Sequence, residues 1–268
     1  MDNLISIITC TLNSAKYLDE LLTSVLQQTV RPSQHVFVDG GSNDGTLEAI
    51  STYAKIVDFD VVTLYAPPMG IANAMNKGAK AATGEFLIHL HSDDLFYDIN
   101  SLAIVQSSLV DRRSNWIAAG CEYVNAQGIQ RGIGPSGPYS RAALLKSNIL
   151  SHPSTVLRRS TFERMGGFDE TLGYAMDYDL WLRMSSNERP LILHEITTKF
   201  RVHEGSTTSS NVKAMRREDL TVRLRFTKGI SARTLACSRF MLIELLLSHS
   251  KMHETYLRAK RLLNRSEN

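Results

Sequence analysis

A chain of 268 residues can form one substantial hydrophobic core, or one domain with a small appended module. With 43% apolar and 21% charged residues, the composition is that of an ordinary soluble globular protein. The longest apolar run near the C-terminus, residues 240–247, is too short to span a bilayer and contains Glu244, which argues against a membrane-spanning helix.

The cysteines and the first residues of the chain indicate its compartment. Cys10, Cys121 and Cys237 lie far apart and are odd in number, which argues against a disulfide framework and against a cysteine metal cluster. The first residues have no basic region and lead directly into a strand-like run, so we expect no signal peptide. A reduced, cytoplasmic protein is therefore expected.

The net charge of +3 conceals an asymmetry between two parts of the chain. Residues 1–210 contain 17 Lys and Arg against 22 Asp and Glu, whereas residues 211–268 contain 13 against 5. A slightly acidic body therefore carries a strongly basic tail. We expect a folded domain at 1–210 and a basic extension at 211–268.

The first part of the chain alternates between strand and helix patterns four times. Short runs of β-branched and apolar residues predict strands at 4–12, 35–38, 61–65 and 86–90, of which the first and the last are expected to be buried. Apolar residues at helical spacing predict helices between these strands, at 17–26, about 46–55 and 70–82. Such alternation is typical of right-handed βαβ units, so the predicted fold class is α/β, with a mostly parallel sheet flanked by helices.

Three carboxylates follow predicted strands: Asp39 follows the second strand, and Asp93 and Asp94 follow the fourth. Because ligands bind at the carboxyl ends of the strands in such sheets, we expect these acids to share one rim. Adjacent carboxylates repel each other, and a divalent metal such as Mn2+ or Mg2+ would satisfy both. The alternative is a solvated Asp-Asp turn that caps the helix beginning near Asp98.

The turns after the strands limit the kind of nucleotide site. The turn after the first strand, Asn13-Ser14-Ala15-Lys16, lacks the glycines of a dinucleotide-binding turn, which argues against a dehydrogenase. The sequence also lacks a phosphate loop of the form Gly-x-x-x-x-Gly-Lys-Ser/Thr. The remaining interpretation is a nucleoside diphosphate held through a metal at the acid pair.

Several motifs occur in a fixed order and spacing along the chain. The first five are SIITCTLN at 6–13, VDGGSNDGT at 38–46, GIANAMNKG at 70–78, ATGE at 82–85 and SDD at 92–94. With HPSTV at 152–156, GGFDE at 166–170, DYDLWLR at 177–183 and RVH at 201–203, the pattern resembles family-2 glycosyltransferases over about residues 4–207. The resemblance implies a GT-A fold, which is Rossmann-like, and an inverting, divalent-metal-dependent transfer of sugar from a nucleotide donor to an acceptor hydroxyl.

The resemblance also implies roles for individual residues. Asp177 matches the catalytic base, and Asp94 and His203 match metal ligands. Contacts with the nucleotide-sugar are expected from Thr11, Asn13, Asp39, Asp44, Asn76, His91, Ser92, Asp93 and His152. Structural alternatives stay open: Asp44 and Asp177 could instead cap helices, and single histidines such as His152 and His203 are often structural.

Departures from the family pattern leave the donor sugar open. His91 stands where relatives often have Asp or Asn, Asn73 where Asp is frequent, and Met176 where Glu is common. The Gln-x-x-Arg-Trp motif of processive members is missing, which indicates the addition of a single sugar. We expect a UDP-sugar donor and a lipid-linked saccharide acceptor in cell-surface polysaccharide biosynthesis. The alternatives are a catalytically silent sugar-nucleotide-binding scaffold and a nucleotidyltransferase.

The resemblance makes residues 1–210 the GT-A catalytic domain, with a nucleotide-binding half at about 1–97 and an acceptor half at about 98–210. A Gly/Pro-rich loop at 127–138 could shape the acceptor site. Apolar spacing in the basic extension predicts two or three helices, which could dock peripherally on an anionic membrane surface, at the inner face of the cytoplasmic membrane, or pack on the body. The basic residues lack an aromatic-stacking pattern, so we expect no nucleic-acid partner.

Overall fold

The computed structural model describes residues 4–109, 114–134, 139–203, 205 and 211–248. The chain forms two compact units, Met1–Asp219 and Leu220–Asn268. The first unit holds the sheet and every predicted site residue. The second holds the end of α9 (Val212–Phe226) and all of α10 (Ile230–Ser248). The boundary between these compact units lies inside α9.

The first half of the larger unit alternates strands and helices, as the hydrophobic periodicity predicts. In chain order the elements are β1 (Ile5–Thr11), α1 (Ala15–Leu26), β2 (Gln34–Asp39), α2 (Thr46–Ala54), β3 (Asp60–Tyr65), α3 (Ile71–Ala81), β4 (Phe86–His89), β5 (Leu95–Phe96) and α4 (Ser101–Ser108). β1 pairs in parallel with β2 and β4, and β2 pairs in parallel with β3. This pairing is the outcome expected of successive βαβ units.

The second half is less regular. Its elements are β6 (Trp116–Asn125), β7 (Gln130–Ile133), α5 (Arg141–Leu144), the 3-10 turn η1 (His152–Ser154), β8 (Thr155–Arg158), α6 (Arg159–Arg164), α7 (Met176–Met184) and β9 (Leu191–Val202). The periodicity did not predict β6, although most of its residues are buried. Its centre is Ala118-Ala119-Gly120, and small residues of this kind have low strand propensity, so sheet pairing decides the conformation there.

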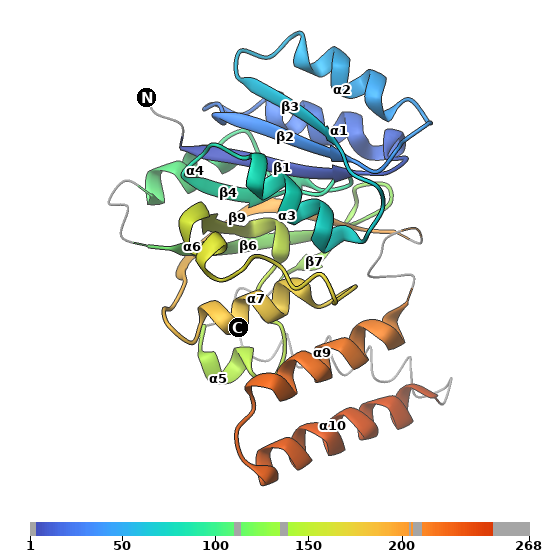
Figure 1. Ribbon diagram of the computed structural model, residues 1–268, viewed down its shortest axis with the longest axis vertical. Coiled ribbons are helices and arrows are strands. Elements are labelled where there is room, and N and C mark those ends of the chain that lie inside the picture. The colour runs from blue at the N-terminus through green and yellow to red at the C-terminus, as the bar shows by residue number, and fades with distance from the viewer. Residues whose placement is uncertain (1–3, 110–113, 135–138, 204, 206–210, 249–268) are drawn as a thin grey trace. The chain divides into compact units, whose positions relative to one another are not determined.

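The strands form one nine-stranded sheet in the order β3-β2-β1-β4-β8-β6-β9-β5, with β7 paired to β6. β8 runs antiparallel to both β4 and β6, and β5 runs antiparallel to β9. Figure 1 shows helices on both faces of this sheet. The predicted α/β class, with a sheet flanked by helices, is therefore confirmed. The sheet is mixed, because β1 to β4 pair in parallel whereas β5, β7 and β8 pair antiparallel with their neighbours.

Two faces of the sheet are covered in different ways. One hydrophobic core contains Leu18, Leu21, Leu22 and Val25 of α1 together with residues of α2, α4, β1 and β4. On the opposite face α3 lies against β1 and β2 (Figure 1). A Cβ atom added to Gly78 of α3 would lie 2.5 Å from Cγ2 of Ile8, so this close approach requires glycine.

The C-terminal extension contributes two helices, α9 and α10, to the part of the chain that the structure describes. The third helix predicted there, around residues 252–263, lies outside the described residues, as do residues 135–138 of the Gly/Pro-rich loop. Within the described ranges, no helix combines the length and the apolarity that crossing a bilayer requires.

Candidate functional site

The carboxyl ends of β1 and β2 meet at one edge of the sheet and carry the first predicted site residues. Thr11 and Asp39 are register partners at the ends of these two strands. The Thr11 hydroxyl donates a hydrogen bond of 2.8 Å to Oδ2 of Asp39, and both residues are buried. The strand ends therefore deliver a paired hydroxyl and carboxylate to the rim where an α/β sheet binds ligands.

Asp39 also organises the turn that follows it. Its Oδ1 accepts hydrogen bonds from the backbone N–H groups of Gly41 and Ser42, each 2.8 Å long, and its Oδ2 accepts one of 2.6 Å from the Ser42 hydroxyl. Burial raises the pKa of Asp39, but these bonds and that from Thr11 outweigh it, so the pKa lies below its ordinary value. Asp39 is thus a fixed anion that shapes the glycine-rich turn.

A chain of hydrogen bonds joins this turn to the loops after β1 and β4. The Asn13 backbone N–H donates to the Ser42 hydroxyl at 2.8 Å, and the Asn43 N–H donates to Oδ1 of Asn13 at 3.0 Å. The Ser92 hydroxyl, after β4, donates to the Ser14 hydroxyl at 2.9 Å. The three predicted residues Asn13, Asp39 and Ser92 therefore belong to one connected rim.

Asp44 has the helix-capping environment that the sequence left open as its alternative role. Its Oδ1 accepts from the Thr46 N–H at 3.2 Å and from the Thr46 hydroxyl at 2.6 Å, at the start of α2. Its Oδ2 accepts from the Ala15 N–H at 3.0 Å, at the start of α1. One carboxylate therefore serves the first turns of two helices, which favours anchoring of the rim over direct contact with a nucleotide.

Asn76 is likewise occupied within the protein. Its Nδ2 donates to the Phe168 carbonyl and to Oε1 of Glu170, both at 2.9 Å, and its Oδ1 accepts from the Phe168 N–H at 2.9 Å. Asn73 donates to Oε2 of the same Glu170 at 2.7 Å. These bonds join α3 to the segment before α7, and they leave the Asn76 amide with little capacity for a ligand.

The two adjacent acids after β4 have different environments. Asp94 is fully buried, and its Oδ1 accepts a hydrogen bond of 3.0 Å from the backbone N–H of Arg201. Its Oδ2 is buried without a hydrogen-bond partner among the described residues. Burial and the neighbouring charge of Asp93 raise the pKa of Asp94 well above its ordinary value. Asp94 therefore lies deeper than Asp93, with one oxygen held by the Arg201 backbone and the other unpaired among the described residues.

Asp93 faces a histidine instead. Its Oδ2 lies 3.0 Å from Nε2 of His203, and both side chains are partly open, at 25% and 16% exposure. The ring of Tyr17 on α1 packs against His203, with 4.8 Å between ring centroids. The Asp93 carboxylate at the mouth of the site is a suitable ligand for Mn2+ or Mg2+, and its exposure favours it over Asp94 as the acid that reaches a metal. The His203 imidazole beside it suits Mn2+ better than Mg2+.

Asp93 and His203 are too few side chains to coordinate a metal ion by themselves. The described part of the chain contains no group of three or more His, Cys, Asp and Glu side chains that could hold a metal ion by itself. Mg2+ and Mn2+ are often bound by one or two side chains and completed by phosphate oxygens and water. Asp93 and His203 fit a metal of that kind, whereas an all-protein cage is excluded within the described residues.

Arg201 contacts the turn that carries Asp93 and Asp94 after β4, which we call the acid turn. No role in the site was expected for Arg201 from the sequence. Its guanidinium is buried, donating to the Asp93 carbonyl and the Ala126 carbonyl, each at 3.1 Å, and to Oε2 of Glu20 at 2.6 Å. It also lies 4.7 Å from the ring centroid of Tyr17. A single cation thus connects α1, the acid turn and the end of β6, which fixes the position of Asp93.

Three histidine rings lie close together beside the acid turn. The rings of His91 and His152 are nearly parallel, with centroids 4.9 Å apart and planes at 9°, and His89 lies 5.9 Å from His152. Burial lowers the pKa of all three, to about 3 for His89. Both ring nitrogens of His152 are buried and meet no hydrogen-bond partner among the described residues. These neutral rings can therefore donate to, or accept from, a ligand.

Asp177 occupies the second position of α7 and is half-buried. Its Oδ2 accepts from Nδ2 of Asn148 at 3.2 Å, and its Oδ1 accepts from the Tyr178 N–H at 2.6 Å. Burial raises the pKa of Asp177 to about 7, and the charge of Asp219 adds to the increase. A carboxylate with this pKa can take up a proton near neutral pH, as a general base must.

Aromatic rings connect α7 with the acid turn. The ring centroid of His152 lies 4.9 Å from that of His91 and 6.3 Å from that of Trp181 on α7. The helix that carries Asp177 therefore lies beside the acid turn. Burial is the main cause that raises the pKa of the Tyr123 phenol on β6, and Asp177 is among the groups that raise it further. The sequence did not single out Tyr123 or Asn148, because neither lies in a motif.

The rim also presents an exposed aromatic residue, Tyr65, at the end of β3. It is 73% exposed, and its ring would lie 3.5 Å from a Cβ atom added to Gly41.

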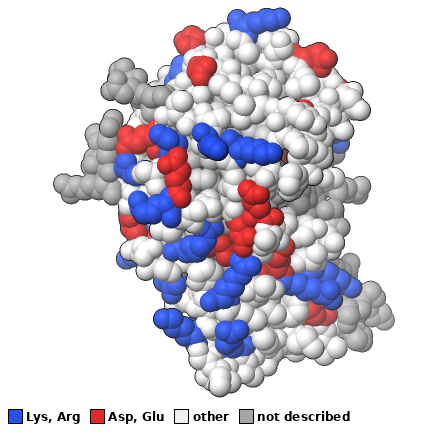
Figure 2. Space-filling model, in the orientation of Figure 1, with Lys and Arg blue, Asp and Glu red and all other residues white. Residues whose placement is uncertain are grey.

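In Figure 2, acidic side chains gather over the region of α3 and α7, between Lys and Arg side chains. The site therefore combines an aromatic surface, fixed carboxylates and neutral imidazoles.

The fold and the site together describe an α/β enzyme of the GT-A type, with its polar residues at the carboxyl ends of the strands. A sequence model of glycosyl transferase family 2 matches residues 6–166, which is more than half of the chain. The protein belongs to glycosyl transferase family 2.

Curated relatives support the same family. The chain is 30% identical over 220 residues to an uncharacterised glycosyltransferase of Rickettsia typhi, covering 77% of this chain and 66% of that protein. It is 29% identical over 182 residues to a PGL/p-HBAD biosynthesis glycosyltransferase of Mycobacterium tuberculosis, covering 68% and 70%. The chain thus spans about two thirds of the length of these relatives.

Solved structures show the same fold. The structure of S. aureus TarS (residues 1–349) with UDP-GlcNAc matches with a TM-score of 0.67 and 22% identity, covering 89% of this chain and 71% of that one. A mannosyltransferase of Pyrobaculum calidifontis, in complex with GDP-Man and Mn2+, matches with a TM-score of 0.63 and 18% identity, covering 96% and 79%. The GT-A fold expected from the sequence motifs is therefore confirmed.

Proposed function

We propose that this glycosyltransferase is a metal-dependent, inverting enzyme that transfers one sugar from a UDP-sugar to an acceptor hydroxyl. The observation that carries the proposal is the position of Asp177. It is a half-buried carboxylate with a pKa of about 7, on the helix whose Trp181 ring packs near His152 and His91 beside the acid turn. A base close to a diphosphate site is what a direct displacement at a sugar carbon requires.

Asp177 acts on the acceptor in this reaction. An acceptor hydroxyl oxygen attacks the anomeric carbon of the donor sugar while its proton passes to a carboxylate oxygen of Asp177. A carbon–oxygen bond forms on one face of the sugar as the bond to the diphosphate oxygen breaks on the other, which inverts the anomeric configuration. The hydrogen bonds from Asn148 and the Tyr178 N–H hold the carboxylate in place for this transfer.

Asp93 and His203 would hold the divalent cation in this proposal, with Asp94 as a buried support rather than a ligand. Mn2+ or Mg2+ bound there would stabilise negative charge on the leaving diphosphate as a Lewis acid. Arg201 keeps Asp93 in place through its bond to the Asp93 carbonyl. The Mn2+ in the Pyrobaculum mannosyltransferase structure supports this assignment by analogy of fold.

The donor is proposed to lie along the rim, from the end of β3 to the histidines. Tyr65 offers an exposed ring for stacking of the nucleobase, beside the Asp39 carboxylate and the Thr11 hydroxyl. His91 and His152 offer uncharged ring nitrogens to the sugar or its phosphates. The UDP-GlcNAc in the S. aureus structure supports a UDP-sugar as the first donor to test.

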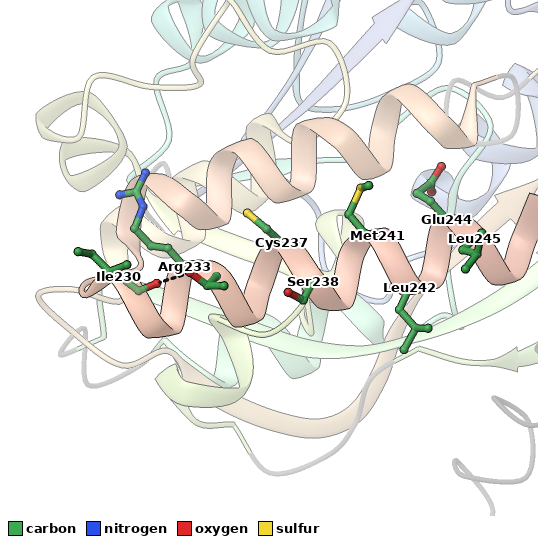
Figure 3. Close-up of a pocket in the computed structure, with 9 residues that line it drawn as sticks. Ile230, Arg233, Cys237, Ser238, Met241, Leu242, Glu244 and Leu245 are labelled. Carbon is green, nitrogen blue, oxygen red and sulfur yellow. Dashed lines mark hydrogen bonds between the residues drawn. The ribbon is translucent and has the colours of Figure 1, made fainter.

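The acceptor is proposed to be a lipid-linked saccharide of cell-surface polysaccharide assembly, reached at an anionic membrane surface through α10. Its apolar side chains are unusually exposed, including Ile230 at 85%, Leu235 at 71% and Met241 at 67%. Figure 3 shows Cys237 and Met241 projecting from one side of α10 and Leu242 from the other, and a cavity of about 890 Å3 lies along this helix. Exposed apolar side chains within a basic segment are suited to anionic lipid.

Donor binding measured by calorimetry tests the proposed activity. UDP-, GDP- and dTDP-sugars would be titrated into the full chain with Mn2+ or with a chelator, and the same titrations repeated on Asp93→Asn. We expect metal-dependent binding of a UDP-sugar that Asp93→Asn weakens at least tenfold. Metal-independent binding, or equal binding by Asp93→Asn, would contradict the metal assignment, and binding without any transfer would favour the silent scaffold.

Vesicle flotation tests the membrane assignment separately. The full chain should float with vesicles that contain anionic phospholipid, more weakly with neutral vesicles, and less at high salt because screening weakens the attraction. Leu242→Ser, at a side chain that is 56% exposed on α10, should reduce flotation. Ile56→Ser, at a side chain 64% exposed on the larger unit, is the matched control and should not. Equal recovery with anionic and neutral vesicles would contradict the proposed docking on an anionic membrane surface.

A further inference from the structure

A glutamate from the C-terminal extension binds the turn that leads into the helix of Asp177. Oε1 of Glu218 accepts a hydrogen bond of 2.8 Å from the Gly173 N–H. Its Oε2 accepts bonds of 2.6 Å and 2.7 Å from the N–H groups of Tyr174 and Ala175. Three consecutive backbone amides therefore converge on a single carboxylate, which is a short, charge-assisted arrangement.

This turn determines where α7 begins. Ala175 is the residue before α7 and has no side-chain oxygen with which to cap it. The Asp179 N–H donates to the Ala175 carbonyl at 3.0 Å as the first bond of the helix, and Asp177 lies between these two residues. Because Glu218 immobilises the turn immediately before the helix, it also restricts the position of Asp177.

Glu218 comes from a part of the chain that the family motifs do not cover. It lies on α9, beyond the matched residues 6–166 and beyond the RVH motif that ends at His203. Within α9, Glu218 and Asp219 are the only acids among several Lys and Arg residues. Both belong to the larger of the two units, and both act on the start of α7.

Asp219 affects Asp177 electrostatically. Burial is the main cause of the raised pKa of Asp177, and the Asp219 charge raises it further, while Asn148 and the Tyr178 N–H lower it. The phenol of Tyr123 on β6 also interacts electrostatically with Asp177, which is among the groups that raise the pKa of that phenol. The C-terminal extension thus contributes one carboxylate to the position of the base and a second to its charge environment.

We propose that residues 212–219 of α9, which belong to the larger unit, are part of the active site, with Glu218 as a positioning residue that holds the 173–175 turn, and with it Asp177, in place for proton transfer. The proposal rests on the proposed role of Asp177 as the base. It makes the extension necessary for turnover even where donor binding is intact, because the donor rim is built from β1, β2 and β4.

Glu218→Gln tests the positioning role with the full chain. The amide cannot accept bonds on both ends, so at least one of the three turn bonds is lost. We expect kcat to fall between 10-fold and about 100-fold, as small misplacements of a catalytic group do, with the donor KM unchanged. Glu48→Gln, at an exposed acid of α2, is the control and should behave as wild type. Wild-type kcat in Glu218→Gln would overturn the proposal.

Two measurements without substrate separate this proposal from the activity itself. Amide hydrogen exchange at residues 173–175 should become faster in Glu218→Gln and not in Glu48→Gln. The Asp177 carboxyl pKa, followed by 13C NMR, should fall in Asp219→Asn, because a nearby negative charge has been removed. Unchanged exchange and an unchanged Asp177 pKa would refute the role of α9. Faster exchange in a protein that transfers no sugar would instead refute only the role of Asp177.

Discussion

Asp177 and the acid turn show that neighbouring carboxylates acquire different properties from their surroundings. Asp39 has a lowered pKa because four donors surround it, whereas burial raises the pKa of both Asp94 and Asp177. A fixed anion suits the rim at the strand ends, a buried carboxyl group suits a support, and a carboxylate that titrates near neutral pH suits a base. Residue type alone would not separate these three roles.

The first residue-scale prediction concerns Asp177→Asn. Removing the base should lower kcat by about 10²- to 10⁴-fold and leave donor affinity intact. Because the folded pKa of about 7 lies above the ordinary value of 3.8, the folded state holds a proton that the unfolded state releases between these pH values. Wild-type stability should therefore fall as pH rises from about 4 to 7, and Asp177→Asn should melt at a higher temperature than wild type at pH 8.

The measurements are transfer assays and thermal melts at several pH values. Asn148→Ala would serve as a comparison, because it removes a hydrogen bond to the carboxylate while leaving the base in place. A pH-independent difference in melting temperature between Asp177→Asn and wild type would contradict the raised pKa.

The second residue-scale prediction compares Asp93 with Asp94. Asp94→Asn keeps the shape of the buried side chain and an oxygen that accepts from the Arg201 N–H, so the melting temperature should change little and metal-dependent donor binding should persist. Asp93→Asn removes an open carboxylate that faces His203 and should abolish the metal dependence. Circular dichroism and calorimetry with and without Mn2+ check both variants. If Asp94→Asn abolished the metal dependence and Asp93→Asn kept it, Asp94 would be the metal ligand instead.

At the scale of elements, the site depends on helices that approach the sheet closely. α3 carries Asn73 and Asn76 and can reach β1 only because residue 78 has no side chain. α1 supplies Tyr17 and Glu20 to Arg201, whose guanidinium reaches the acid turn. The rigid part of the site is therefore a property of packed elements, whereas its chemistry is carried by the loops between them.

The element-scale prediction is that Gly78→Ala destabilises the larger unit. The added Cβ atom would lie 2.5 Å from Cγ2 of Ile8 and 3.1 Å from Cγ2 of Val38. Alanine gains up to about 1 kcal/mol of helix propensity over glycine, but overpacking costs about 1–3 kcal/mol. Urea unfolding should show a net loss, with Gly132→Ala, where an added Cβ atom meets nothing within 4 Å, as the control. A stabilised Gly78→Ala would show that α3 can move away from the sheet.

For the whole molecule, the two units have different relations to the ligand. All the rim residues, Asp177 and Glu218 belong to Met1–Asp219, whereas the apolar surface of α10 belongs to Leu220–Asn268. A donor bound only by the folded first unit should stabilise that unit by mass action and leave the second unchanged.

The whole-molecule prediction follows from this division. At about 100 times its Kd, a bound nucleotide stabilises by about 2.7 kcal/mol, which for a domain of this size raises the melting temperature by about 5–10 °C. Calorimetric scans with UDP and Mn2+ should show that shift, and a chelator should remove it. Asp93→Asn should not shift, and an equal shift in that variant would contradict the proposed metal site.

The sequence by itself determined the alternation of β1 to β4 with their helices, because apolar periodicity is local and β1, β2 and β4 are buried on both faces. It also located the rim, because polar residues at strand ends fall on one edge once the strands are parallel. β6 was not predictable, since Ala118, Ala119 and Gly120 form a strand only when β8 and β9 pair with them on either side.

Only the tertiary structure decided which acid of the pair is buried, which groups surround Asp177 and which distant residue holds its turn. Asp93 and Asp94 are adjacent in sequence, yet one faces His203 and the other the backbone of Arg201. Glu218 reaches the 173–175 turn from more than 40 residues away. Burial and electrostatic environment depend on contacts between distant segments, and local sequence patterns do not contain them.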